Sequence, residues 1–232
     1  MEDEIDLMDY VKVILKRKVF ILSLFLAAII VAAIFSFLSP KVYKISTVLE
    51  IGNFGNEPLE APDQLIEKLK TGSYKITVME SLEITEKDYP EVETENPKNT
   101  RLMVREVESS DPERVKAILE EVNSLILVDH EEKLDLLKSM TEKDMEEIQR
   151  GLALLETQKI YADQGIASLQ ATLFSLKQKL NFAEPTKITK PPLISENPIR
   201  PRPLLNMAIA GILGLFMGTF LAFGREWWEK AK

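Results

Sequence analysis

Few side chains in this 232-residue chain have the chemistry of a catalytic or metal site. The chain holds no Cys and a single His, which excludes thiol catalysis, disulfide frameworks, cysteine-based zinc sites and iron–sulfur clusters. The phosphate-binding loop G-x-x-x-x-G-K-[ST] and the motifs H-E-x-x-H, D-x-D-x-D-G and G-x-S-x-G do not occur. With no cysteine or second histidine to join it, His130 is predicted to be a solvated helix residue rather than a metal ligand.

Adjacent glutamates are the other candidates for acid–base chemistry. Such pairs lie among lysines on predicted helices: Glu120/Glu121, Glu131/Glu132 and Glu146/Glu147. We interpret them as solvated helix faces, because nothing in the pattern indicates a cleft around them. The sequence therefore predicts a protein that is not an enzyme, with no catalytic residues and no cofactor. A net charge of -8 also argues against binding to a nucleic-acid backbone.

Two long apolar segments indicate where in the cell the protein is located. Residues 19–38 and 204–223 carry no charged side chain, and each has the length of about 20 residues that crosses the hydrocarbon core of a bilayer. The mean hydropathy of -0.05 hides them, because the segment between them is strongly polar. A cleaved signal peptide is the alternative for the first segment, although no A-x-A site closes it, and a buried core helix is the alternative for the second. We predict two transmembrane helices.

Basic residues set the expected orientation of these helices. A basic cluster precedes the first span and consists of Lys12, Lys16, Arg17 and Lys18. Fewer basic residues follow the span closely. The positive-inside rule therefore places residues 1–18 in the cytoplasm, and a second span returns residues 224–232 to it. Trp227 and Trp228 fit an interfacial aromatic belt. We expect a multi-pass protein of the plasma (inner) membrane whose main part, residues 39–203, is periplasmic or otherwise extracytoplasmic.

The outer segment begins with a mixed pattern that predicts an α/β base over residues 39–110. Val42–Ile51 alternates apolar and polar residues as a strand does, and Thr100–Ser109 is a second predicted strand. Between them, Asn53–Glu60 is expected to be a loop and Ala61–Lys70 a helix. The predicted fold class is α+β, with two transmembrane helices flanking this base and a long coiled-coil helical arm.

Residues 111–182 are predicted to form that arm. Asp111 and Pro112 make a good helix start, an acceptor side chain followed by proline at the first helical position. Apolar residues then recur at alternating spacings of three and four, the repeat of a coiled coil. The predicted core positions, interrupted by Lys159, are Met145, Ile148, Leu152, Leu155, Ile166, Leu169, Leu173, Leu176 and Leu180. The alternative is an amphipathic helix on a globular core.

One straight helix of this length cannot return to the membrane. It would rise roughly 105 Å, whereas the residues between it and the second span cover about 80 Å when fully extended. We therefore favour a hairpin whose turn lies within Ser139–Gly165. The unbroken spacing after Met145 favours the early end of that range, near Thr141.

A proline-rich return segment, residues 183–203, precedes the second span. Repeated proline keeps a chain extended and semi-rigid, so we predict a spacer. Its characteristic prolines are Pro191, Pro192, Pro198, Pro201 and Pro203.

Small residues recur inside both predicted spans. In the second span, Ala210, Gly214 and Gly218 form a small-xxx-small ridge that lets helix backbones approach closely in lipid. The first span repeats the same spacing at Ala28, Ala32 and Ser36. The ridge predicts helix–helix packing within the membrane.

The order of these segments resembles the Wzz chain-length determinant family, the polysaccharide co-polymerases. The likeness lies in the basic flank before the first span, the following SPKVYKISTVLEIG and a long helix opening DPERVKAILEEVNSLI. It continues in the return PPLISENPIRPRP and in the glycine-bearing span AGILGLFMG ending in RE. The resemblance implies an α/β base, a long extracytoplasmic helix and assembly into membrane-anchored rings. It also implies a role in setting the length of surface polysaccharide without catalytic residues.

The resemblance leaves several functions open. The first is a homo-oligomeric regulator that contacts a polysaccharide polymerase and its nascent glycan, which is O-antigen, capsule or exopolysaccharide. The outer segment is short for O-antigen members, and no kinase domain follows the second span, so a fused kinase is not expected. The second is a transmembrane adaptor that activates a separate cytoplasmic tyrosine kinase in exopolysaccharide export. The third is a coiled-coil scaffold unrelated to glycans.

Overall fold

The computed structural model describes residues 7–157 and 163–230. The chain forms two compact units, one made of Met1–Val42 and Asn197–Lys232, the other of Tyr43–Glu196. The first unit is helical and the second mixes helices with sheets, which agrees with the expected α+β class.

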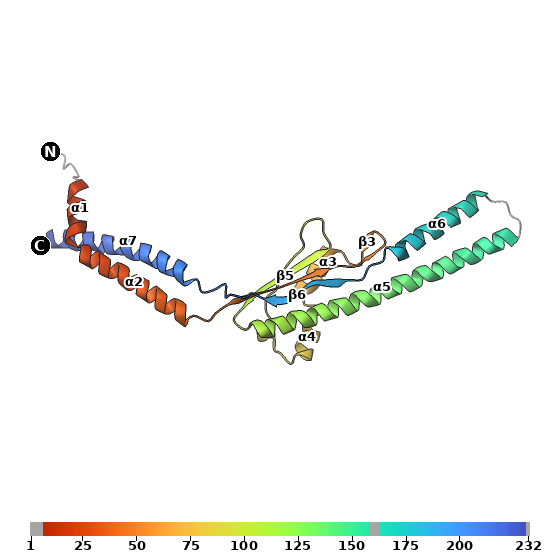
Figure 1. Cartoon of the computed structure of the whole chain (residues 1–232), viewed down its shortest axis with the longest axis horizontal. Helices are drawn as coiled ribbons and strands as arrows, with labels where there is room; N and C mark the ends of the chain where they lie inside the picture. The colour runs from red at the N-terminus through yellow and green to blue at the C-terminus, as the bar shows by residue number, and fades with distance from the viewer. Residues whose placement is uncertain (1–6, 158–162, 231–232) are drawn as a thin grey trace. The chain divides into compact units, whose positions relative to one another are not determined.

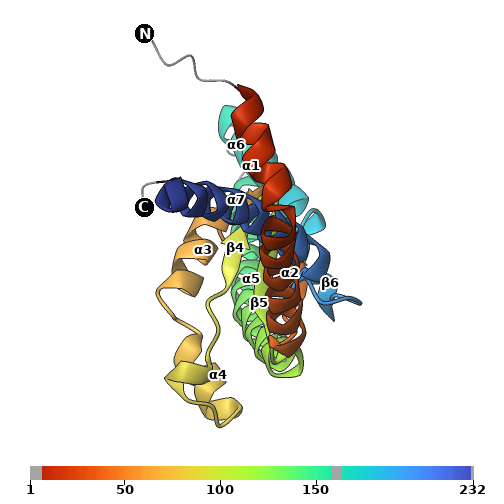
Figure 2. The ribbon, with the colours of Figure 1, turned by 90° about the vertical axis from the view of Figure 1, so that its left-hand side faces the viewer.

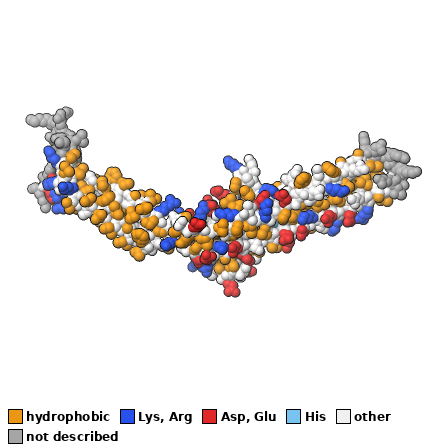
Figure 3. All heavy atoms as spheres, viewed as in Figure 1, with side chains coloured by type: hydrophobic (Ala, Val, Ile, Leu, Met, Phe, Trp, Pro, Cys, Tyr) orange, Lys and Arg blue, Asp and Glu red, His pale blue; other side chains and the backbone are white. Residues whose placement is uncertain are grey.

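The helical unit contains α1 (Leu7–Lys16), α2 (Lys18–Leu38) and α7 (Pro203–Lys230). Helices α2 and α7 pack side by side, and both are long and apolar enough to cross a membrane (Figure 1). Large apolar side chains such as Phe35 and Phe216 are exposed along them, and orange dominates these helices in Figure 3. A core helix of a soluble protein would bury such side chains, so the exposure favours a lipid environment over the core-helix alternative.

The mixed unit is built on a four-stranded antiparallel sheet in the order β4-β5-β1-β6. Its strands are β4 (Glu93–Glu95), β5 (Leu102–Ser109), β1 (Tyr43–Glu50) and β6 (Lys187–Ile194). The two strands predicted from alternation, β1 and β5, are confirmed and pair with each other over their full length. Figure 2 shows β6 at one edge of this unit, away from β4, α3 (Pro62–Lys70) and α4 (Lys75–Ser81).

One face of the sheet carries the core. Alternate residues of β1 and β5 point toward α5 (Pro112–Thr157), which covers them with an apolar stripe. Leu65 of α3 and Val78 of α4 complete the same cluster. The fully buried apolar side chains from the sheet and α5 are Ile45, Leu49, Met103, Ile118, Leu119, Val122 and Ile126. Each Å² of apolar surface removed from water contributes about 25 cal/mol to the free energy of folding. These buried side chains are therefore the main source of stability of the unit.

The segment between β1 and β5 is partly as expected. The predicted helix over Ala61–Lys70 is confirmed as α3, with Pro62 at its first position. The predicted loop Asn53–Glu60 contains a short hairpin of β2 (Asn53–Phe54) and β3 (Glu57–Pro58). Gly55 turns it with a φ of 65°, a conformation that glycine adopts without strain.

The predicted arm begins where expected and forms two helices. The Arg114 N–H donates to Asp111 Oδ1 over 3.3 Å, so Asp111 caps α5. Helix α6 (Asp163–Asn181) packs against α5, and the two run side by side in Figure 1. The two helices form a hairpin, and residues 158–162, which connect them in the sequence, lie outside the described range.

The turn predicted near Thr141 is wrong. Thr141 lies inside α5, where its hydroxyl donates to the Leu137 carbonyl over 2.8 Å. A long coiled coil is not confirmed, because the apolar series is divided between two helices of one hairpin. The first four core positions lie on α5 and the last five on α6, and all nine are half-buried. Each helix of an antiparallel pair needs its own apolar stripe, so the same spacing arises without one continuous helix.

The predicted spacer is also wrong in its middle, where residues 187–194 form the edge strand β6. Pro191 and Pro192 lie in this strand, which pairs with β1 through register shifts. An edge strand tolerates proline because one side of it needs no ladder hydrogen bond. Pro198 and Pro201 follow the strand, the Arg200–Pro201 peptide is cis, and Pro203 begins α7.

Candidate functional site

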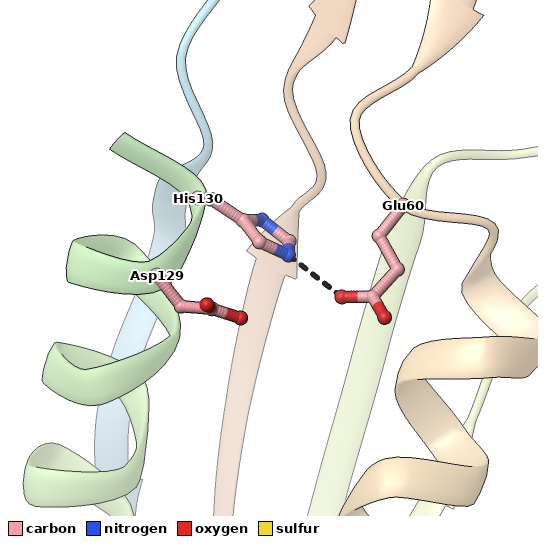
Figure 4. Close-up of side chains that lie close together, drawn as sticks. All are labelled: Glu60, Asp129 and His130. Carbon is pink, nitrogen blue, oxygen red and sulfur yellow. Dashed lines mark hydrogen bonds and ion pairs between the residues drawn. The ribbon is translucent and has the colours of Figure 1, made fainter. Parts of the chain in front are cut away.

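A buried polar cluster around His130 joins four segments of the mixed unit. Helix α5 contributes Asp129 and His130, the short segment between β3 and α3 contributes Glu60, and α3 itself contributes Lys68. Thr186, just before β6, closes the cluster from the opposite side. Figure 4 shows the imidazole of His130 and the carboxylate of Glu60 turned toward each other.

Both ring nitrogens of His130 have partners. Nδ1 lies 2.6 Å from Thr186 Oγ1, and Nε2 lies 3.1 Å from Glu60 Oε2. The Gly52 N–H donates to Thr186 Oγ1 over 2.8 Å. Since that hydroxyl has a single proton, both ring nitrogens are satisfied when it donates to Nδ1 and the Nε2–H donates to Glu60.

Lys68 supplies the positive charge of the cluster. Its Nζ lies 2.7 Å from Glu60 Oε1 and 3.6 Å from Asp129 Oδ2, and the Tyr74 hydroxyl donates to Asp129 over 2.9 Å. Burial would raise the pKa of Glu60, but hydrogen bonds from Lys68 and His130 outweigh it and hold that pKa below its usual range. The same hydrogen bond to Glu60 raises the pKa of Lys68.

The prediction that His130 is solvated is wrong, since only 1% of the residue is exposed. His130 follows Ile126 by four residues and precedes Leu134 by four, so it continues the buried stripe of α5. That spacing is a signal in the sequence that could have placed it inside. Its partners, 70 and 56 residues away in the chain, left no local signal.

The cluster has donors for a divalent cation. One ligand atom each from Glu60, Asp129 and His130 lie within 4.8 Å of one another. A carboxylate–carboxylate–imidazole set suits such an ion, but the Lys68 ammonium already lies between the two carboxylates. The arrangement is best described as a buried Glu60–His130 pair, closed by the partly exposed Lys68, that ties α3, α5 and the start of β6 together.

A second buried network centres on Arg105 of β5, which is 1% exposed. Its Nη1 donates to Asn123 Oδ1 over 3.0 Å, and the Asn123 amide donates to Thr47 Oγ1 over 3.0 Å. The Thr47 hydroxyl in turn donates to the Lys190 carbonyl over 2.9 Å. This chain connects β5, α5, β1 and β6, and burial lowers the pKa of Arg105 to about 10.

Arg105 also borders an open groove of about 1100 Å³ beside β4 and β5. The groove mixes charges of both signs with one aromatic ring; its lining includes Lys44, Lys70, Lys75, Tyr89, Glu93, Glu95 and Glu106. Several of these charges already have partners, such as Lys44 with Glu106 at 2.6 Å. The groove therefore has no dominant charge that would select an anion or a cation.

The small residues predicted to pack in the membrane line the contact between α2 and α7. A Cβ added to Gly214 would lie 2.8 Å from the Ala28 Cβ, and one added to Gly218 would lie 3.2 Å from the Ile21 Cα. Ala210 is half-buried on the same helix. The ridge thus lies against the other helix of the same chain.

Polar contacts lie toward both ends of this helix pair. Asn206 donates its amide to Ser36 Oγ over 2.9 Å. Toward the other end, Lys16 Nζ lies 2.8 Å from Glu226 Oε1, and Arg17 pairs with Glu226 and Glu229. These contacts fix the register of α2 against α7.

A sheet covered by helices and a helical hairpin define an α+β class of protein, and the two long apolar helices fit a protein of the inner membrane. Residues 3–90 match the family model of Wzz, the chain length determinant protein, which confirms the resemblance inferred from the sequence. Among curated proteins, no sequence matches this chain.

One solved structure has the same fold. A full-length bacterial polysaccharide co-polymerase superposes with a TM-score of 0.50 at 14% identity, over 98% of this chain and 99% of that chain. A fragment of WzzB, a polysaccharide co-polymerase from Salmonella Typhimurium, is similar at 11% identity with a TM-score of 0.28, over 69% of this chain and 100% of the fragment. The assignment of the fold therefore rests on the full-length structure.

Proposed function

We propose that the chain is a polysaccharide co-polymerase, an oligomeric membrane scaffold that regulates the chain length of a surface polysaccharide by contact with its polymerase. The observation that carries this proposal is the Wzz family match over residues 3–90, which includes α2 and the first part of the mixed unit, through β1, α3 and α4. The shared fold of the full-length co-polymerase supports it. In this proposal the protein acts by assembly and contact, without bond chemistry.

The buried polar groups support a structural rather than catalytic role. Thr186, His130 and Glu60 have the order of a hydroxyl, base and acid, but the Thr186 hydroxyl already accepts the Gly52 N–H and is buried. A nucleophile needs access to substrate, so this chain of hydrogen bonds holds segments together instead.

Exposed apolar side chains on the hairpin support self-association into a homo-oligomer. Leu136, Met140 and Leu154 of α5 and Phe174 of α6 are each more than half exposed. Large apolar side chains of this kind on a polar surface favour a protein partner. We propose that the partner is a second copy and that copies close into a ring, which imaging of the detergent-solubilised particle tests directly.

Deletion and complementation of the gene test the regulatory function. Polysaccharide synthesis should continue in the deletion strain, while the modal band on a gel is lost and then restored by the intact gene. Complete loss of polymer, rescued only when one acidic residue is intact, would identify an enzyme. Loss of polymer together with loss of tyrosine phosphorylation in a separate kinase would support the adaptor function instead.

The proposal places both termini in the cytoplasm and the mixed unit on the periplasmic side of the inner membrane. The chain has no native Cys, so single cysteines report location cleanly. Cysteine at Ser39 or Lys187 should react with an impermeant thiol reagent in intact cells. Cysteine at Lys232, which is outside the described residues, should not. The reverse labelling pattern would contradict the orientation.

A further inference from the structure

Helix α1 has an exposed apolar side that neither α2 nor α7 covers. Val11, Ile14 and Leu15 are 49%, 39% and 61% exposed, and their spacing puts them on one side of the helix. Lys12 and Lys16, four residues apart, are also exposed and lie on another side. A helix this short with one apolar and one basic side is amphipathic, and in water its apolar side would be unfavourably hydrated.

The position of α1 limits what can cover that side. Only Arg17 separates α1 from α2, and its φ of -106° and ψ of 15° are not helical. The two helices therefore bend relative to each other at Arg17, as Figure 1 shows. If α2 crosses the bilayer, as the proposed function requires, α1 begins its course at the membrane surface.

The end of α7 also indicates the position of the membrane surface. Lys16 and Arg17 pair with Glu226, and the next two residues are Trp227 and Trp228, which are 72% and 64% exposed. Exposed tryptophans at the end of an apolar helix are typical of the headgroup layer of a bilayer. The contact between Lys16 and Glu226 thus places the start of α2 and these indole rings at one depth.

We infer that α1 is an interfacial helix that lies in the phospholipid headgroup layer, with Val11, Ile14 and Leu15 inserted toward the acyl chains. The occupant of the apolar side is the lipid leaflet that α2 and α7 enter, because the chain connects α1 to that leaflet directly. Lys12 and Lys18 are exposed near the same level, where lipid phosphates complement their charge. The inference rests on the membrane placement in the proposed function, and it adds a third membrane contact to the two spans.

Lipid quenching of single-cysteine probes tests the inference in the full chain. Ile14→Cys and Leu15→Cys report the apolar side, and Lys12→Cys is the matched control on the basic side. Phe216→Cys is the control for a span, since Phe216 is exposed on α7. Each variant carries an environment-sensitive fluorophore and is reconstituted into vesicles of phosphatidylethanolamine and phosphatidylglycerol. Quenching by lipids with a nitroxide at a shallow acyl position is then compared with quenching by aqueous iodide.

Probes at positions 14 and 15 should be quenched several-fold more by the nitroxide lipid than the probe at position 12, and iodide should show the opposite order. Strong iodide quenching at 14 and 15 would overturn the inference, because their side of α1 would then face water. Protection from both quenchers would also overturn it, because a second copy or another protein would then cover α1. Failure of nitroxide lipids to quench the probe at position 216 would instead contradict the membrane placement itself.

Discussion

His130 connects segments that are distant in the chain, because its two ring nitrogens bond to Thr186 and Glu60. Replacing His130 with Ala leaves both partners buried without it, together with a cavity. We expect a loss of about 2–4 kcal/mol in the free energy of unfolding. Urea unfolding of the full chain in detergent measures it.

Glu131→Ala is the matched control on the same helix. Glu131 is exposed, so its substitution should change the free energy of unfolding by about 0.5 kcal/mol or less. Equal effects of the two substitutions would show that the His130 cluster does not stabilise the fold.

Glu60 should make stability depend on acid pH. Its pKa is lower in the folded chain than its ordinary value of 4.5, so the folded carboxylate binds protons less readily than the unfolded one. Its contribution to stability is therefore full above pH 4.5 and is lost as the pH falls through the folded value. The melting temperature of the wild type should fall over this window. Glu60→Gln should be less stable at neutral pH and should lose less on acidification; an unchanged pH profile would contradict this role.

The burial of His130 could be predicted from the sequence, whereas its hydrogen-bond partners could not. Its four-residue spacing from Ile126 and Leu134 places it on the buried side of α5. The identity of its partners depends on how α3 and the start of β6 come together across the sheet, which spacing along one segment does not encode. The same holds for Arg105, whose amide partner Asn123 lies on a different element.

At the scale of elements, the contact between α2 and α7 depends on the absence of a side chain at Gly214. An added methyl group would lie 2.8 Å from the Ala28 Cβ and 3.2 Å from the Phe25 Cα, so Gly214→Ala forces the helices apart. We expect a lower melting temperature in detergent, equivalent to about 1–3 kcal/mol of overpacking. Gly214→Leu should have a larger effect.

Gly224→Ala is the control on the same helix. A Cβ at Gly224 would have no neighbouring atom within 4 Å, so its melting temperature should stay near that of the wild type. Because the glycine ridge packs within one chain, any change in particle size with Gly214→Ala should accompany loss of stability. A change in particle size with unchanged stability would indicate that Gly214 packs between chains.

Elements with a strong local pattern could be predicted, and those defined by tertiary contacts could not. Strands β1 and β5 alternate clearly, and the cap at Asp111 marks the start of α5. Strand β6 contains Pro191 and Pro192 and is stabilised by pairing with β1, so its own sequence indicates a spacer. The hairpin was predicted, but its turn was placed too early within Ser139–Gly165, because the apolar spacing of α5 happens to continue in phase into α6.

At the scale of the whole molecule, we expect the proposed function, regulation by assembly and contact, to depend on the length of the α5–α6 hairpin. Because α5 and α6 pack against each other, removing seven residues from each preserves the facing stripes. Deleting residues 149–155 with 165–171 removes the outer core positions Leu152, Leu155, Ile166 and Leu169 and shortens the hairpin by about 10 Å. In the complemented deletion strain, this variant should shift the modal length of the polysaccharide.

The matched controls separate hairpin length from helix charge and from folding. Glu146→Ala changes an exposed charge that contributes only about 0.5 kcal/mol, so the modal length should stay the same. Deleting 149–155 alone leaves α6 facing a shortened partner and should lower stability as well as disturb the length distribution. An unchanged distribution with the paired deletion, in a protein that melts and assembles as the wild type does, would show that the outer hairpin takes no part in length control. The function would then reside in the sheet-bearing base or in the membrane helices.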